Sequence, residues 1–433
     1  MRAALERYFE FERLKTTWRT EVLAGVTTFV AMAYIIFVNP AILSETGMPL
    51  AAVTAATCLC AAFGSLLMGA YARYPIALAP GMGLNAYFTY SVVKGMGIPW
   101  ETALGAVFLS GVAFLILTLL GVRQMIMQAI PRDLYSAVAA GVGLFIALIG
   151  FRTTGIIVAS PATLVTLGNL AKPETLLSVF GLLLMAALLV WEVRAAILIG
   201  VVATTAVGAA FGIVHWQPQS YSWTALSATA FHLDIPAALR IGLLEIVFVF
   251  LFVDLFDNVG TLVAVGTKAG LFKDSESIPR IGRILIADAS ATVAGSLAGT
   301  STVVSYIESA AGVVAGGRSG VTSIVVGLLF LVALFIAPWM GAVPGAATGP
   351  ALIIVGSLMM TQVAEIAWAD PLIAIPAFLT MTTIPLSFSI ANGLAFGFTA
   401  HTILRVAYGK FREIHWLGYA LTALFLARFL YLS

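Results

Sequence analysis

Four acidic side chains are unusual because long apolar stretches surround each of them. They are Asp254, Asp257, Asp288 and Glu308, and none has a lysine or arginine beside it at the same depth of its apolar segment. A charged carboxylate at the centre of a bilayer is costly unless it is protonated, paired or hydrated. Without a neighbouring cation, such acids favour the neutral form. They are therefore candidates for carrying protons and for accepting hydrogen bonds from a ligand.

The spacing of these residues predicts that they converge on one site. Asp254 and Asp257, in the motif FVDLFDNVGT, are three residues apart and share one face of a helix. Glu308 follows an extended stretch in SYIESAAG, and Asn85 has the matching position in APGMGLNAYF. Both are expected at the start of a half-helix, where backbone N–H groups lack partners. Carboxylates, an amide and free N–H groups suit a small, flat, neutral ligand better than a metal ion.

Several of these residues also have a purely structural interpretation. Asp257 would then bond a neighbouring helix, Asp288 would support a hydrogen-bond network, and Asn85 would cap its half-helix. An acid inside a membrane is nevertheless functional by default, which favours a role in transport or binding. The aromatic residues of the region, among them Phe88 and Tyr306, are expected to pack, with stacking on a planar ligand as the alternative.

The composition indicates what kind of protein positions these groups. Of the 433 residues, 61% are hydrophobic and only 10% are charged, whereas a soluble domain has about 25% charged residues. A formal net charge of +2 gives no basis for binding nucleic acid. The chain is therefore predicted to be an all-α polytopic membrane protein. The two cysteines are expected to be small packing residues, with no disulfide or metal site.

A membrane-spanning helix needs about 20 mainly apolar residues, and fourteen segments meet this condition. They are 21–43, 51–70, 75–94, 101–121, 136–151, 174–192, 195–214, 240–267, 280–298, 299–317, 319–337, 349–366, 371–385 and 388–407. A further apolar stretch, 415–432, is interpreted as an interfacial helix, with a fifteenth span as the alternative.

The distribution of basic residues predicts the orientation. With the N-terminus in the cytoplasm, seventeen Lys and Arg residues fall on the cytoplasmic side and four on the other. This bias follows the positive-inside rule and places both termini in the cytoplasm. Residues 1–20 alternate in charge and lack the apolar core of a signal peptide, so they are expected to form an amphipathic helix on the membrane surface.

Two of the fourteen segments are not regular helices in their sequence pattern. In 74–90, Pro80 and neighbouring glycines interrupt the helix, and in 299–314 a β-branched run precedes a second helical pattern. Non-helical backbone at this depth must be enclosed by protein or line a cavity. Each segment is third in a run of seven, which predicts a 7+7 inverted repeat. Paired broken helices of this kind indicate a transporter's binding site.

Long motifs of the chain resemble one known family. They are ERYFEFERLKTTWRTEVLAGVTTFVAMAYIIFVNPAIL, APGMGLNAYF, FVDLFDNVGTLVAVG and GTSTVVSYIESAAGV. They look like the nucleobase–cation symporter-2 family, also called the nucleobase/ascorbate transporters, in its azaguanine-like hypoxanthine/adenine/guanine permease branch. The resemblance implies proton-coupled purine uptake at the cell membrane by elevator-like motion of a core domain against a gate domain. It also implies a possible homodimer.

The resemblance implies domain boundaries as well. The core domain is expected at 21–121 (spans 1–4) and 236–337 (spans 8–11), the gate domain at 122–235 (spans 5–7) and 338–410 (spans 12–14), and peripheral segments at 1–20 and 411–433. In the family, an acid of span 8 and a carboxylate of span 10 hold the base, which implies Asp254 and Glu308 here. Asp257 and Asn85 are implicated as well, and proton coupling falls to Asp254, Asp257, Asp288 and Glu308.

Residue types at the binding positions imply a substrate class. Asp at 254 with Glu at 308 favours adenine, guanine and hypoxanthine over uracil and xanthine, whose carriers show a Glu in span 8 and often, for xanthine, a Gln in span 10. The expected ligands are thus a purine and a proton, with no metal or organic cofactor.

Other functions remain as alternatives on the sequence alone. An anion transporter on the same architecture predicts a cation at a half-helix end, and a uracil or xanthine symporter predicts other binding residues. An intramembrane enzyme needs a nucleophile–base pair, and neither His nor Cys is near the acids in the sequence. A channel or receptor without transport activity also stays open.

Overall fold

A computed structural model of the chain describes residues 2–121, 132–214, 227–240, 244–268, 270, 279–337 and 343–431. Seven helical stretches in these ranges are long and apolar enough to cross a membrane. They are Trp18–Ser44, Leu50–Ala72, Trp100–Leu119, Asp133–Thr153, Pro173–Val190, Ile281–Ala298 and Gly345–Glu365. Shorter apolar helices cover Ala196–Ala210, Gly320–Ile336, Pro371–Ser387 and Gly418–Ala427.

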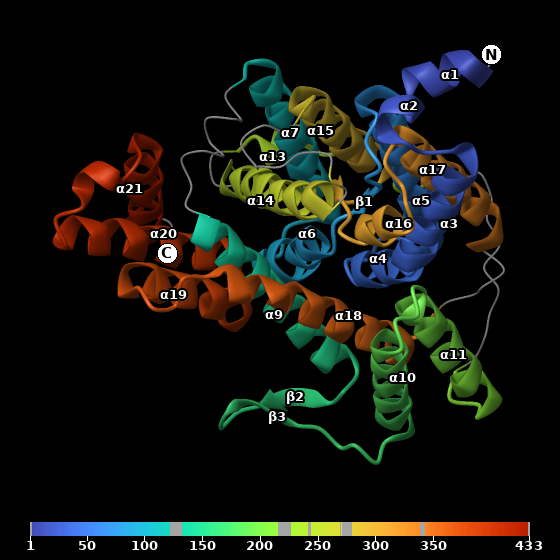
Figure 1. Cartoon of the computed structure of the whole chain (residues 1–433). Helices are drawn as coiled ribbons and strands as arrows, with labels where there is room; N and C mark the ends of the chain where they lie inside the picture. The colour runs from blue at the N-terminus through green and yellow to red at the C-terminus, as the bar shows by residue number, and fades with distance from the viewer. Residues whose placement is uncertain are drawn as a thin grey trace.

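The first half of the chain is helical with two short strand regions (Figure 1). Its elements are α1 (Arg2–Tyr8), α2 (Phe11–Leu14), α3 (Trp18–Met32), α4 (Ile35–Ser44), α5 (Leu50–Leu67), η1 (Met68–Ala72), β1 (Leu78–Pro80), α6 (Met82–Ala86), η2 (Tyr87–Gly95), α7 (Trp100–Leu119), α9 (Arg132–Thr153), β2 (Ile157–Ser160), β3 (Leu164–Leu167), α10 (Pro173–Val190) and α11 (Ala196–Ala210).

The second half is also mainly helical and contains the fourth strand. Its elements are α13 (Ile235–Ala238), α14 (Leu244–Lys268), α15 (Ile281–Ala298), β4 (Val303–Ser305), α16 (Ser309–Val314), α17 (Gly320–Ile336), α18 (Gly345–Met359), η5 (Met360–Glu365), α19 (Pro371–Ser387), α20 (Ile390–Ala407), η6 (Phe411–Glu413) and α21 (Trp416–Tyr431).

The segments predicted from hydropathy coincide with these elements. Each of the fourteen contains a helix, and each of the two irregular ones contains a strand followed by a helix. The first predicted segment differs, because it is divided at Tyr34 into α3 and α4. Pro40 lies inside α4. A proline has no N–H to donate to the carbonyl four residues before it, and its ring clashes with that carbonyl. At the break itself, the Ile36 and Phe37 N–H groups donate to the Ala33 and Tyr34 carbonyls, three residues back, which makes a tight turn there.

The N-terminal segment also differs from the single amphipathic helix expected for it. Glu10 has a left-handed backbone (φ +58°) and separates α1 from α2. Phe9 and Phe11, on either side of it, are buried against Val321 of α17. Burying both aromatic rings requires the chain to turn between them, which one straight helix does not allow.

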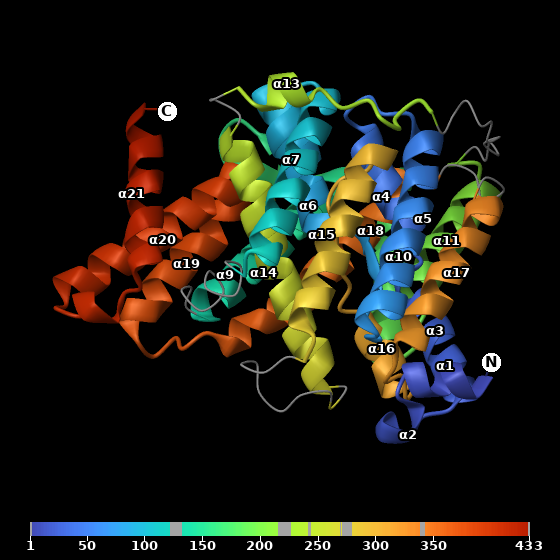
Figure 2. The ribbon, with the colours of Figure 1, turned by 90° about the horizontal axis from the view of Figure 1, so that it is seen from above.

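The helices pack in two main groups. One consists of α3, α5, α7, α15 and α17, which contact one another in sequence-distant pairs such as α5 with α17 and α7 with α15. The other consists of α9, α10, α11, α18, α19 and α20, with α18 and α19 both lying on α9 (Figure 1). In Figure 2 the helices of the first group run in similar directions, with α1 and α2 at one end and α13 at the other.

Two peripheral features lie outside these groups, and hydropathy predicted only the second of them. Residues 157–167 form an antiparallel hairpin of β2 and β3, which projects away from the helices in Figure 1. At the C-terminus, α21 packs on α20, where Phe425 is buried beside Phe398 and Thr422 bonds Thr402. The expected interfacial helix thus has one face against the rest of the protein.

Candidate functional site

The two irregular segments meet at the centre of the molecule. Strands β1 and β4 pair antiparallel, with Leu78 opposite Ser305 and Pro80 opposite Val303. The pairing extends beyond the strands, since the Gly81 N–H donates to the Thr302 carbonyl at 2.9 Å. A Cβ at Gly81 would lie only 2.9 Å from Val304 Cγ2, so the close crossing requires a glycine there. The non-helical backbone thereby finds partners within the protein, as burial in an apolar environment demands.

Each strand is held in the same way by the helix that precedes it. Ser65 Oγ of α5 donates to the Leu78 carbonyl at 3.1 Å and accepts from the Leu78 N–H at 3.0 Å. Thr292 Oγ1 of α15 donates to the Val303 carbonyl at 2.9 Å and accepts from the Val303 N–H at 3.3 Å. A single hydroxyl therefore satisfies both backbone groups of a strand residue in each half of the chain.

The first polar cluster joins α14, α15 and β4. The Asn258 amide donates to Asp254 Oδ1 at 3.2 Å and to Asp288 Oδ2. Its carbonyl accepts from the Ser305 N–H at 3.0 Å. Asp254 and Asn258 are fully buried, and Asp288 is 1% exposed. The two acids predicted from the sequence are thus brought together by an amide that links them to the strand crossing.

The second cluster surrounds Glu308, which directly precedes α16. Tyr34, at the junction of α3 and α4, donates its hydroxyl to Glu308 Oε1 at 2.5 Å. Tyr306 is 5% exposed and donates its hydroxyl to the Pro80 carbonyl at 2.6 Å, across the strand crossing. A carboxylate that accepts from a phenol and lies beside an enclosed strand crossing can both bind a ligand N–H and take up a proton.

The third cluster contains Asn85 and lies on the side of α6. Asn85 donates to Asn39 Oδ1 at 2.5 Å, and Asn39 in turn donates to Thr57 Oγ1 and Thr300 Oγ1. Asn85 Oδ1 is buried and has no hydrogen-bond partner among the described residues. Asn85 therefore lies in an asparagine–threonine network, and the amide of Asn258, rather than that of Asn85, contacts the acids.

Other predicted residues have different surroundings. Phe88 is fully buried and packs near Phe250, with ring centroids 6.4 Å apart. Asp257 lies on α14, but its side chain is outside the described residues. The expectation of free N–H groups at the start of α16 is not met, because Ser309 and Ala310 donate to carbonyls of the preceding turn. A tight turn into the helix, rather than an extended entry, supplies those carbonyls.

Three residues of the clusters were not predicted as site residues from the sequence. Asn258 is four residues after Asp254 and hence on its helix face, which is a signal that periodicity could have provided. Asn39 directly precedes Pro40 inside an apolar run, and Tyr34 has the same hydropathy class as its neighbours. Tyr34 bonds Glu308 and Asn39 bonds Thr300, and each of these partners is more than 200 positions away in the chain. The other two partners of Asn39, Thr57 and Asn85, are nearer.

A cavity of about 240 Å³ lies between α4 and α18, and none of the cluster residues is among those that line it. Pro40, Ile42 and Thr348 contribute to its walls, and Glu45 and Tyr90 are also among its lining residues. The Tyr90 hydroxyl donates to Glu45 Oε1 at 2.6 Å. Among the residues that the structure describes, no group of three His, Cys, Asp or Glu side chains is placed to hold a metal ion.

Comparison with known proteins assigns the chain to a family. The Permease family model (xanthine/uracil permeases) matches residues 19–396. The chain is 54% identical to a putative permease of Methanocaldococcus jannaschii, with 99% of each chain covered. It is 46% identical to the guanine/hypoxanthine permease PbuG of Bacillus subtilis (99% of this chain, 100% of the relative) and 42% identical to the adenine permease AdeP of Escherichia coli (95% and 92%).

Solved structures share the fold. The transmembrane domain of the cyanobacterial bicarbonate transporter BicA aligns with a TM-score of 0.68 at 15% identity, covering 87% of this chain and 98% of that one. Together with the apolar helices, these similarities identify a multi-pass membrane transport protein rather than an enzyme. The chain belongs to the Permease family of nucleobase–cation symporters, as its motifs indicated.

Proposed function

We propose that this protein takes up purine nucleobases (adenine, guanine or hypoxanthine) together with protons across the cell membrane. The observation that carries the proposal is the buried Asp254–Asn258–Asp288 cluster and Glu308, all at the crossing of β1 and β4. Relatives named as adenine and guanine/hypoxanthine permeases, at 42% and 46% identity over nearly the whole chain, support the substrate class.

The binding chemistry follows from the donors and acceptors at the crossing. A purine presents ring N–H donors, and Asp254 and Glu308 are the acceptors proposed for them. Asn85 Oδ1, which lacks a partner among the described residues, is a further acceptor for an exocyclic or ring N–H group. Phe88 and Tyr306 are proposed to enclose the ring. Because a buried carboxylate favours its neutral form, binding of a proton and of the base are coupled there.

Proton coupling is assigned to the acids as a group. Glu308 already accepts from Tyr34, and Asp254 and Asp288 share the Asn258 amide. Asp257, one helical turn from Asp254, is included because of the sequence resemblance. Two carboxylates held by one amide bear less repulsion when one of them is protonated, so the cluster is suited to exchange one proton with the substrate cycle.

The architecture proposed is fourteen spans in a 7+7 inverted repeat, with both termini in the cytoplasm. The matched supports of Leu78 by Ser65 and of Val303 by Thr292 agree with such a repeat, since each strand lies third in its half. The two packing groups agree with core and gate domains at the boundaries given above. A homodimer is proposed from the family resemblance.

Transport is proposed to occur by an elevator-like movement of the core against the gate. Asp288 lies on α15 of the first group, and α14, with Asp254, and α16, which follows Glu308, contact α7 and α3 of that group, so the substrate would move with it. The cavity lies between α4, which packs on α5 of the first group, and α18 of the second, where such a movement would open and close a crevice. Gly83 of α6 also lies at this boundary, where a Cβ would be 2.4 Å from Val142 Cγ1 of α9.

Uptake in a host that lacks its own purine carriers tests the function. Labelled hypoxanthine, adenine and guanine are expected to accumulate in cells expressing the protein, and Glu308→Gln and Asp254→Asn are expected to abolish accumulation. Asn392→Ala, on α20 outside the clusters, serves as the matched control. Uptake of labelled bicarbonate or sulfate instead of purines would establish the anion transporter, and wild-type uptake by both acid variants would contradict the site.

A further inference from the structure

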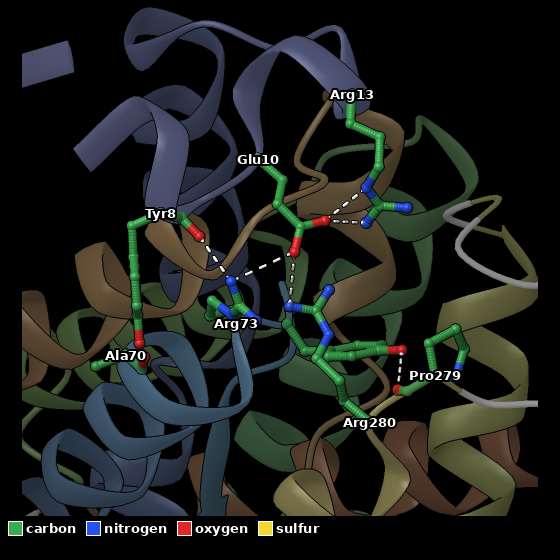
Figure 3. A network of polar contacts seen from close by, with 8 residues as sticks. Tyr8, Glu10, Arg13, Ala70, Arg73, Pro279 and Arg280 are labelled. Atoms are coloured by element: carbon green, nitrogen blue, oxygen red, sulfur yellow. Dashed lines mark hydrogen bonds and ion pairs between the residues drawn. The ribbon is translucent and has the colours of Figure 1, made fainter. Parts of the chain in front are cut away.

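A cluster of arginines at one end of the molecule has no role in the transport site. Glu10, between α1 and α2, accepts hydrogen bonds from Arg13 at 2.5 Å and from Arg280 at 3.2 Å, and it forms an ion pair with Arg73 at 3.4 Å (Figure 3). Arg73 follows η1 and Arg280 directly precedes α15. Three guanidinium groups thus share a single carboxylate, which leaves a surplus of two positive charges. We call these four residues the arginine cluster.

Among the residues that the structure describes around the cluster, basic side chains outnumber acidic ones. Arg283, one turn into α15, lies over the Tyr71 ring at 5.6 Å. Besides Arg13 and Glu10, the described N-terminal residues up to Arg19 contain four basic and two acidic side chains. The pKa of the Arg280 guanidinium lies below its ordinary value, chiefly because the group is partly buried, and repulsion by Arg73 and Arg13 acts in the same direction against the attraction of Glu10.

The backbone of the cluster is strained. Glu10, Arg73 and Arg280 have φ values of +58°, +61° and +58°, in the left-handed region that side chains other than glycine rarely adopt. Such conformations are strained and are concentrated at functional sites. Three of them converge here to bring three side chains from distant parts of the chain to one point.

The donors of the cluster are not all used by the protein. Arg73 donates from one Nη to the Tyr8 carbonyl at 2.9 Å, and its Nε–H, which is buried, has no acceptor among the described residues. The side chains of Arg73 and Arg280 are 20% and 22% exposed, and that of Arg13 is 62% exposed. Guanidinium N–H groups therefore remain available to a ligand that approaches from outside. A planar fork of such donors matches phosphate oxygens.

The position of the cluster defines the depth at which that ligand lies. The apolar stretch Leu50–Ala72 ends one residue before Arg73, and the stretch Ile281–Ala298 begins one residue after Arg280. Arginines that flank two spans lie at the level of lipid headgroups. Tyr8, whose hydroxyl donates to the Ala70 carbonyl, and Tyr74 stack under Arg73 and Arg280. Aromatic residues are enriched at this same interface.

We propose that the arginine cluster binds the phosphate of an anionic phospholipid headgroup. The phosphate would take the Nη donors that Glu10 does not saturate, and its charge would compensate the surplus. A bound lipid would tie α1 and α2 to the ends of α5 and α15. Basic pockets at the ends of membrane helices are the usual sites of such recognition.

The test is lipid binding by the purified full-length protein in a neutral detergent. Phosphatidylglycerol and phosphatidylcholine of the same acyl chains are titrated, and retained lipid is counted by native mass spectrometry. Phosphatidylglycerol is expected to bind more tightly than phosphatidylcholine. Arg73→Gln, Arg280→Gln and the surface variant Arg13→Gln are each expected to weaken it about fivefold, the effect of one interfacial arginine.

Two further variants separate lipid binding from a structural role. Arg405→Gln removes an arginine of similar exposure (18%) that pairs with Glu413, and it is expected to bind phosphatidylglycerol as the wild type does. Glu10→Gln removes the competing carboxylate and is expected to tighten binding, whereas a purely structural cluster would be damaged equally by losing either partner. Equal binding of the two lipids, or unchanged binding by all three arginine variants, would overturn the proposal.

A competition experiment distinguishes a lipid headgroup from free phosphate as the ligand. Inorganic phosphate at millimolar concentration is added before the lipid titration at constant ionic strength. The proposal expects little displacement of phosphatidylglycerol. Full displacement, with thermal stabilisation by inorganic phosphate equal to that by the lipid, would show that the ligand is a soluble phosphate and would refute the lipid assignment.

Discussion

Replacing Asn258 by alanine is expected to abolish uptake while the helices still fold. The Asn258 amide makes three hydrogen bonds, two to Asp254 and Asp288 and one from the Ser305 N–H. The variant removes the donor shared by the two acids and leaves a buried N–H without its acceptor. Each bond to a charged group contributes about 1.5–3 kcal/mol and each unsatisfied buried group costs about 1–3 kcal/mol.

Only part of this lost free energy is expected to fall on substrate binding. The binding free energy of hypoxanthine is expected to weaken by at least about 3 kcal/mol. This corresponds to more than about a 100-fold loss of affinity. Binding of hypoxanthine to the purified variant is measured by calorimetry, and uptake in cells expressing it is measured alongside. Size-exclusion chromatography establishes that the variant is monodisperse.

Two companion variants locate the cause. Asn258→Asp keeps the size of the side chain and its acceptor for Ser305 but replaces both donors, so it is expected to lose binding as the alanine variant does. Asn392→Ala removes an amide of α20 outside the clusters and is expected to bind normally. The reasoning is refuted if Asn258→Ala binds hypoxanthine within threefold of the wild type, because the acids then need no shared donor.

Three further perturbations have defined outcomes. Glu21 is fully buried and accepts from backbone and hydroxyl donors at the start of α17, Thr322 among them, so Glu21→Gln is expected to lower the unfolding free energy by about 2 kcal/mol, measured by thermal unfolding in detergent. Gly83→Ala is expected to slow uptake more than it weakens binding, because its Cβ would meet Val142, and adding Val142→Ala is expected to restore the rate. Burial raises the pKa of Tyr74 to about 12 in the folded protein, against about 10 when unfolded. The folded state therefore holds this proton more tightly, stability should fall as the pH rises from about 10 to 12, and Tyr74→Phe should remove that decline.

The sequence was sufficient for the positions of the helices and of the acids. Hydropathy is a local property, so each of the fourteen apolar segments contains a helix. Likewise, a carboxylate in an apolar run is conspicuous wherever it occurs, which is why Asp254, Asp288 and Glu308 could be selected. The strand–helix breaks were also readable, because Pro80 and the β-branched run around Val303 disfavour helix locally.

The contacts between the segments could not be predicted in the same way. Tyr34 reaches Glu308 across 274 positions of the chain, and neither residue type nor spacing signals that pairing. Asn258 was overlooked because an amide beside two acids carries no charge of its own. The assignment of Asn85 to the asparagine–threonine network depends on how α4 packs on α6, which is a tertiary property.

Uptake by proteoliposomes with an imposed pH gradient tests the central claim, that the buried acids couple a proton to a purine. With the interior alkaline, the purified protein is expected to accumulate labelled hypoxanthine above the external concentration, and a protonophore or Glu308→Gln is expected to remove the accumulation. Unlabelled adenine and guanine should compete, and uracil should not. Accumulation that is independent of the gradient, or that persists fully in Glu308→Gln, would contradict the account.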